Sequence, residues 1–302
     1  MIRRTMAAAI LAFAAVAAFS LNAQAQSVTD PQDAVAIFNA AQNLHEKGRL
    51  AEALRLYEEA IKIEPQFAEA EYQRGIVQLS LGKTIDAERS FRRAVELRPE
   101  WTLAMASLGS LLVQQSKLDE AEKILVKVLT SDPSNPPALT ALADLYLKTG
   151  APSNSLQDLW TKIAILTGKA SPTASLWTAQ AALENALGRR GQAKQSIANA
   201  LLIDGSNSSA LLLAGNIAIV EGDIVKAKEI LTRLTGNSSD PVMVVYLRAN
   251  VLAFDGDYDE AITQLNSIKA NNKDAGDLLS RITTSRLTSA VELEKALAAN
   301  AN

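Results

Sequence analysis

A motif that recurs every 34 residues constrains this chain more than any other feature. The stretch GRLAEALRLYEEAIKIEP at Gly48–Pro65 returns as GKTIDAERSFRRAVELRP at Gly82–Pro99. The small and apolar positions are shared by the two copies, whereas the charged positions differ. Packing rather than a reaction therefore explains the recurrence, and we expect one structural unit to be stacked along the chain.

A glycine marks the same place in most of these units. It falls at residues 48, 82, 150, 188, 222 and 256, and Ser116 fills the remaining slot. The interval from Gly150 to Gly188 is 38 residues, which indicates a four-residue insertion around Thr167–Thr173. Apolar residues at helical spacing flank each slot, and a glycine there can adopt the left-handed backbone that ends a helix. We therefore expect each unit to be a helix, a turn and a second helix.

The pattern resembles the tetratricopeptide repeat family over about residues 34–275. In the first copy Ala53, Tyr57 and Ala60 occupy the small, large and small positions of the second helix, and Pro65 follows it. The resemblance implies an all-α fold, a right-handed α-solenoid of antiparallel helix hairpins. One hairpin cannot bury its apolar face alone, so neighbouring hairpins must stack. The small residues are expected where two helix backbones approach closely.

The repeat frame predicts the organisation of the whole chain. A signal peptide is expected at 1–25, a lead-in at 26–33, and C-terminal capping helices with a tail at 274–302. The expected repeats are 34–67, 68–101, 102–135, 136–173, 174–207, 208–241 and 242–273. The fourth repeat departs most from the pattern, and we expect its second helix to be shifted toward Trp160 and Ala164.

The N-terminus is typical of an export signal. Two arginines precede the alanine-rich stretch Met6–Leu21, and Ala23-Gln24-Ala25 offers small residues for cleavage after Ala25. An uncleaved membrane anchor is the alternative, but this apolar stretch is short for a span. We therefore expect a periplasmic protein, or a secreted one, with no stable membrane insertion after cleavage.

Composition excludes several classes of function. The chain has a formal net charge of -3 and mixed charges along its length, which argues against a nucleic acid partner. It has no cysteine and one histidine, His45, so neither a thiolate nor a multi-histidine metal site is expected. We expect no metal and no cofactor.

No catalytic constellation is evident. Ser80-Leu81-Gly82-Lys83 and Lys148-Thr149-Gly150 match two motifs of acylating enzymes, but both fall on the turn slot of a repeat and the S-D-N motif is missing. The pair Glu58-Glu59 lies in a second helix, where a solvated face is expected rather than a pocket for general acid catalysis. The sequence therefore indicates a protein that is not an enzyme.

The resemblance implies a peptide-binding groove on the concave surface, formed by the first helix of each repeat. The residues assigned to this groove are Phe38, Gln42, Tyr72, Ile76, Ser110, Asp144, Asn185, Asn216, Tyr246 and Asn250. Asn216 and Asn250 stand at one position of successive repeats and could hydrogen-bond the backbone of an extended peptide; alternatively they only face water. The groove positions carry no lysine or arginine, which argues against the family's clamp for C-terminal carboxylates.

The function that these features favour is a non-enzymatic scaffold that binds a protein or peptide partner and helps to assemble or organise a cell-envelope complex. The alternative is an accessory subunit that binds glycan in exopolysaccharide or peptidoglycan handling. None of Trp101, Trp160 and Trp177 is expected to face the groove, so the sequence favours the first function. Self-association through other surfaces is left open, as are the oligomeric state and the identity of the partner.

Overall fold

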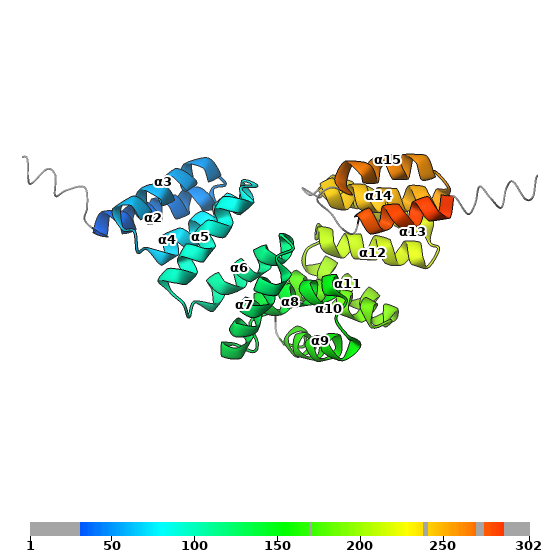
Figure 1. Ribbon diagram of the computed structural model, residues 1–302, viewed down its shortest axis with the longest axis horizontal. Helices are drawn as coiled ribbons and strands as arrows, with labels where there is room; N and C mark the ends of the chain where they lie inside the picture. The colour runs from blue at the N-terminus through cyan, green and yellow to red at the C-terminus, as the bar shows by residue number, and fades with distance from the viewer. Residues whose placement is uncertain (1–30, 170, 238–240, 270–274, 287–302) are drawn as a thin grey trace, which may run out of the picture. The chain divides into compact units, whose positions relative to one another are not determined.

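The computed structural model describes residues 31–169, 171–237, 241–269 and 275–286 (Figure 1). The expected signal peptide at 1–25 lies outside the described residues, as do residues 287–302 of the expected C-terminal segment. Within the described ranges the regular structure is helical, with no strand. The all-α fold expected from the sequence is thus confirmed.

The helices come in consecutive pairs, and each pair falls on one unit of the recurrence, the fourth unit being longer than 34 residues by its insertion. The paired helices are α2 (Pro31–Glu46) with α3 (Leu50–Ile63), α4 (Ala68–Ser80) with α5 (Thr84–Leu97), α6 (Thr102–Gln114) with α7 (Leu118–Ser131), α8 (Pro136–Thr149) with α9 (Ser153–Thr167), α10 (Ala174–Ala186) with α11 (Arg190–Ile203), α12 (Ser208–Val220) with α13 (Ile224–Asn237), and α14 (Pro241–Asp255) with α15 (Tyr258–Ile268). Residues 275–286 are also helical. The chain divides within α8 into two compact units, Met1–Leu145 and Tyr146–Asn302.

The turn inside each pair has one construction. The six turn glycines have φ between 66° and 90°, and Ser116 in the remaining slot has φ 60°. The residue after each of them donates its N–H to the carbonyl five residues earlier, as from Arg49 to Leu44 at 2.9 Å. This is the bond of a Schellman motif, which satisfies a carbonyl that the ending helix leaves open. The prediction of a helix-ending left-handed residue is confirmed.

Small residues stand where helices approach closely. A Cβ added to Gly75 would lie 2.7 Å from Phe91 Cε1, and one added to Gly109 would lie 2.6 Å from Leu125 Cδ2. In the second unit a Cβ on Gly215 would lie 2.7 Å from Leu247 Cδ2. These distances are far below ordinary carbon–carbon contact, about 3.5–4.0 Å. Close packing at the small positions, which the repeat pattern predicts, is therefore confirmed.

The core of each unit follows the repeat. In the first unit the three core residues at the repeat positions of Ala53, Tyr57 and Ala60 are fully buried in each second helix; the later triplets are Ala87, Phe91 and Ala94, then Ala121, Leu125 and Val128, where valine takes the place of the second alanine. In the second unit Leu278 and Ile282, from helical residues 275–286, pack in a cluster with Ala249 and Leu265. These residues cover the last hairpin, in the role expected of a C-terminal capping helix.

The second helix of the fourth repeat differs from the expectation. Trp160 and Ala164 are only half-buried, and the core is filled instead by Leu156, Leu159 and Ile163. The inserted residues lengthen the link after α9, so that six residues, 168–173, precede α10 where four, 64–67, precede α4. The helix keeps its large core leucine at 159 and moves its flanking apolar contacts by one residue.

Candidate functional site

The position of Phe38 and Tyr72 shows that part of the predicted groove belongs to the core of the first unit. The Phe38 ring lies 4.8 Å from that of Phe67, and the Tyr72 ring lies 4.9 Å from that of Trp101, centroid to centroid. Each also contacts the large aromatic residue of its own second helix, at 5.7 Å and 5.6 Å. Contacts of this kind hold aromatic side chains in defined geometry.

Tyr72 consequently has little surface left for a ligand. It is 8% exposed, and its hydroxyl lies 3.3 Å from Ser107 Oγ. Replacing it would disturb packing between repeats before it tested a peptide contact. The sequence feature that could have indicated this contact is the aromatic residue near the end of each of the first two repeats. These residues, Phe67 and Trp101, are 34 residues apart.

The other predicted residues of the first unit lie nearer the surface. Gln42, Ile76 and Ser110 are half-buried on α2, α4 and α6, and Asp144 is exposed on α8. In the second unit Asn185, Asn216, Tyr246 and Asn250 are half-buried on α10, α12 and α14. We call these last four, with the intervening exposed parts of the same three helices, the second unit's first-helix surface.

The asparagine amides of this surface differ in what they bind. The Asn250 Nδ2 donates to the Tyr246 carbonyl at 3.3 Å, so one of its hydrogens is used within its own helix. The side chains of Asn185 and Asn216 have no hydrogen-bond partner among the residues that the structure describes. A half-buried carboxamide offers two donors and an acceptor, so both residues retain capacity for an outside ligand.

On α10 and α12 the second unit's first-helix surface carries almost no charge, whereas α14 contributes the half-buried Arg248 and the exposed Asp255. Helix α12, SSALLLAGNIAIV, has no ionisable residue, and the only one in α10, Glu184, is buried. The second helices contrast with this, because α11 and α13 present Lys194, Lys228 and Arg233 to solvent. The second helices α11 and α13 therefore carry more exposed charge than the first helices α10 and α12.

Glu184 is the acceptor of a buried polar network. Its carboxylate accepts hydrogen bonds from Trp160 Nε1 at 3.0 Å, Gln180 Nε2 at 2.9 Å and Ser196 Oγ at 2.7 Å. The network joins α9, α10 and α11. Because every donor is satisfied and Glu184 is 2% exposed, the arrangement stabilises the packing of these helices and offers no open base.

A related network lies in the first unit. Arg74 donates to Glu71 at 2.5 Å and to Ser90 Oγ at 2.9 Å, and Ser90 donates to Gln78 at 2.7 Å. Burial raises the pKa of Glu71, and the charge of Arg74 opposes this rise. Ser90 and Ser196 occupy the same repeat position, so the polar core device occurs twice. Sequence reasoning missed it, although polar residues at core positions were its signal.

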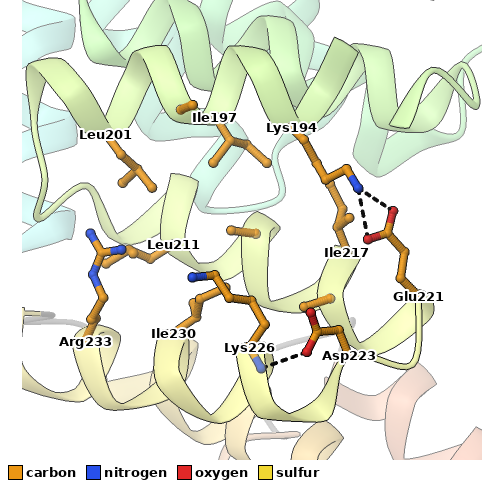
Figure 2. Close-up of a pocket in the computed structure, with 13 residues that line it drawn as sticks. Lys194, Ile197, Leu201, Leu211, Ile217, Glu221, Asp223, Lys226, Ile230 and Arg233 are labelled. Carbon is orange, nitrogen blue, oxygen red and sulfur yellow. Dashed lines mark hydrogen bonds and ion pairs between the residues drawn. The ribbon is translucent and has the colours of Figure 1, made fainter. Parts of the chain in front are cut away.

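The structure also shows a trough that sequence reasoning did not predict. It has a volume of about 410 Å³ and lies on the second-helix side of the second unit, between α11 and α13 with α12 as its floor (Figure 2). Ile197, Leu201, Leu211, Ile217 and Ile230 give it an apolar lining. No motif marks it, because its residues come from three helices.

Two of the three tryptophans named for the glycan alternative are engaged within the fold, and the third, Trp177, is half-buried. Trp101 contacts Tyr72, and the Arg98 guanidinium lies 4.8 Å from its ring. Trp160 donates to Glu184, and Arg189 lies 5.0 Å from its ring. Across the described ranges, no group of three or more histidine, aspartate or glutamate side chains is arranged to hold a metal ion. None of the described helices is long and apolar enough to cross a membrane.

Comparison with known proteins agrees with this architecture. Family models described as TPR repeat and tetratricopeptide repeat match residues 41–82 and 112–155. No curated protein matches the chain.

Solved structures share the fold at low sequence identity. A tetratricopeptide repeat protein from Parabacteroides merdae is 15% identical, with 83% of this chain and 99% of that chain covered, at a TM-score of 0.60. A chain of the APC/C hetero-tetramer Cut9–Hcn1 is 16% identical at a TM-score of 0.62, and the match covers 77% of this chain but only 45% of that one. The two repeat matches, the paired helices and the shared fold support the assignment of this chain to the tetratricopeptide repeat family.

Proposed function

We propose that this protein is a non-enzymatic scaffold that binds a polypeptide partner on its first-helix surface and helps to assemble or organise a cell-envelope complex. The observation that carries the proposal is the uncharged part of the second unit's first-helix surface on α10 and α12, where Asn185 and Asn216 have amides without partners among the described residues. One structural neighbour, Cut9–Hcn1, is a hetero-tetramer, which supports a protein as the ligand of such a fold.

An extended peptide fits the chemistry of this surface. Its backbone alternates N–H and C=O groups, and a carboxamide can accept from the first and donate to the second. Apolar residues on the same helices, such as Leu212 and Ile219, can contact the peptide side chains. Main-chain hydrogen bonds would supply affinity and the apolar contacts would supply selectivity.

The absence of charge on α10 and α12 outside the buried Glu184 sets the character of the partner segment. A charged segment would lose hydration there without gaining an opposite charge. The part of the partner that contacts α10 and α12 is therefore uncharged. Binding to such a surface depends weakly on salt, since screening acts on charges.

Photocrosslinking tests the proposal in intact cells. A photoreactive amino acid is placed at Asn216, and the matched control carries it at Asn154, an exposed asparagine on α9. We expect mass spectrometry to identify a protein that is crosslinked from position 216 and not from position 154. Identical products from both positions, or no product from either, would contradict the proposal.

The periplasmic location is a separate proposal that rests on residues 1–25. Cell fractionation followed by N-terminal sequencing tests it. We expect the mature protein in the periplasm and beginning at Gln26. A chain that keeps Met1 and stays in the cytoplasm would overturn the location without touching the binding surface.

A further inference from the structure

We propose that the trough between α11 and α13 is a second interaction site, which takes an amphipathic helix of a protein partner with an aliphatic ridge and a carboxylate at one end. Its walls belong to the second helices α11 and α13, and its floor is formed by residues of α12 other than Asn216. The inference therefore stands or fails independently of that function.

The walls of the trough have the dimensions of a helix ridge. One wall runs along α11 from Lys194 to Leu201 and the other along α13 from Lys226 to Arg233. Figure 2 shows the two walls running in the same direction, with Leu211 and Ile217 of α12 between them. Each wall spans about two helical turns, about 10 Å. Aliphatic side chains spaced one turn apart on a partner helix match this length.

Ordinary packing does not close this space. Leu201 and Ile230 contribute to the cores on either side of the trough, yet a volume of about 410 Å³ stays open between them. Ala198 lines the trough and is exposed, so the wall is low on the α11 side. An open trough with an apolar floor favours a protein segment over a small molecule, which requires enclosure on most sides.

The charges at the two ends give the trough a direction. At one end Lys194 Nζ is neutralised by both oxygens of Glu221, at 2.9 Å and 3.1 Å, and Asp223 accepts the backbone N–H of Lys226 at 3.0 Å. At the other end Arg233 donates to the Gly205 carbonyl at 3.2 Å and has no carboxylate partner in the described part of the chain.

Lys226, the other cation on the α13 wall, is not available to a partner's carboxylate, because its amino group is paired with Glu229 at 2.9 Å. Arg233 is thus the cation of the trough that lacks a carboxylate partner among the described residues, and its guanidinium can bind a carboxylate through two parallel hydrogen bonds. This fixes the class of partner as an aliphatic ridge that ends in an aspartate or glutamate at the Arg233 end.

Designed peptides test the site on the full chain. Three fluorescent helical peptides share a ridge of leucines and differ at one end in carrying glutamate, glutamine or lysine. We expect anisotropy titrations to rank the glutamate peptide tightest and the lysine peptide at least about tenfold weaker. With R233E the order should reverse, since the charge at that end has changed sign.

Occlusion provides the second measurement. Ala198→Trp fills the trough from an exposed position, so we expect the fold to be retained. The affinity for the glutamate peptide should fall at least about tenfold. Ala51→Trp, at an exposed position on the second helix α3 of the first unit, is the matched control and should leave affinity unchanged. Circular dichroism melts verify that both variants fold.

Four outcomes would overturn the proposal. The first is that the three peptides bind equally, and the second is that Ala198→Trp and Ala51→Trp have equal effects. The third is saturation of the trough by dodecanoate without competition by the peptides, which would assign it to a small amphiphile. Dimer dissociation on Ala198→Trp, seen by analytical ultracentrifugation without peptide binding, would assign it to a second copy of the chain.

Discussion

Two glycine-to-alanine substitutions should have opposite effects on stability, although each glycine lies within a helix. At Gly75 on α4 the new Cβ would lie 2.7 Å, 2.8 Å and 3.1 Å from three atoms of the Phe91 ring. At Gly191 on α11 the new Cβ would meet nothing within 4 Å. Neither residue has a positive φ, so the backbone accepts alanine at both sites and only the surrounding space differs.

The magnitude follows from two opposing terms. Alanine in place of glycine stabilises a helix by up to about 1 kcal/mol. Overpacking a filled core costs about 1–3 kcal/mol, because the ring or the helix must move by roughly 1 Å to restore carbon–carbon contact. Gly191→Ala should therefore raise the free energy of unfolding by up to about 1 kcal/mol. Gly75→Ala should lower it, by up to about 2 kcal/mol.

Urea unfolding followed by far-ultraviolet circular dichroism checks both variants against the wild type. The difference between the two variants is the quantity that matters, since it removes most of the shared propensity term. Equal changes in the free energy of unfolding at the two sites would refute the claim that the small positions are set by close helix approach.

Further predictions concern the turns and the buried and surface charges. Ser116→Gly should raise the free energy of unfolding by about 1 kcal/mol, because a left-handed backbone is costly for a residue with a Cβ; an unchanged urea midpoint would contradict this. Burial raises the pKa of Glu71, against the charge of Arg74, so its contribution to stability is present below the ordinary glutamate pKa and is lost as pH rises through the folded value. Relative to wild type, Glu71→Gln should therefore gain stability as pH is raised in chemical denaturation, and a difference constant with pH would oppose this reasoning. The hydrogen bonds from Arg92, at 2.6 Å and 2.8 Å, lower the pKa of Glu120. Arg92→Ala should lower the free energy of unfolding by about 1 kcal/mol near neutral pH, and by less at acid pH or high salt. A decrease that is the same at all pH values and salt concentrations would assign the effect to packing.

The sequence predicts those parts of the fold that recur. The turn at Ser116 could be placed because six glycines occupied the equivalent slot, and Gly75 or Gly109 could be read as close contacts because the slot is small in every repeat. Such positions are fixed by backbone geometry, which is the same in each hairpin. The pairing of the helices and their order along the chain follow from the spacing of these recurring positions.

The parts that the sequence did not predict depend on contacts between different repeats. Tyr72 was assigned to the groove by its position, but the ring of Trp101 from the following junction covers it. Trp160 was expected in the core, yet the longer link after α9 leaves it half-buried and bonded to Glu184. The trough beside Arg233 combines residues from three helices, and no spacing along one helix indicates it.

The central claim is that a polypeptide binds the first-helix surface of the second unit. Isothermal titration of the crosslinked partner's segment tests it most directly, with the wild type, the Asn185→Ala, Asn216→Ala, Asn250→Ala triple variant and an Asn154→Ala control. We expect the triple variant to lose at least about tenfold in affinity, the control to match the wild type, and the wild-type affinity to change little from roughly 0.05 to 0.5 M salt. Equal affinity of the triple variant and the wild type, or a steep fall with salt, would contradict the account.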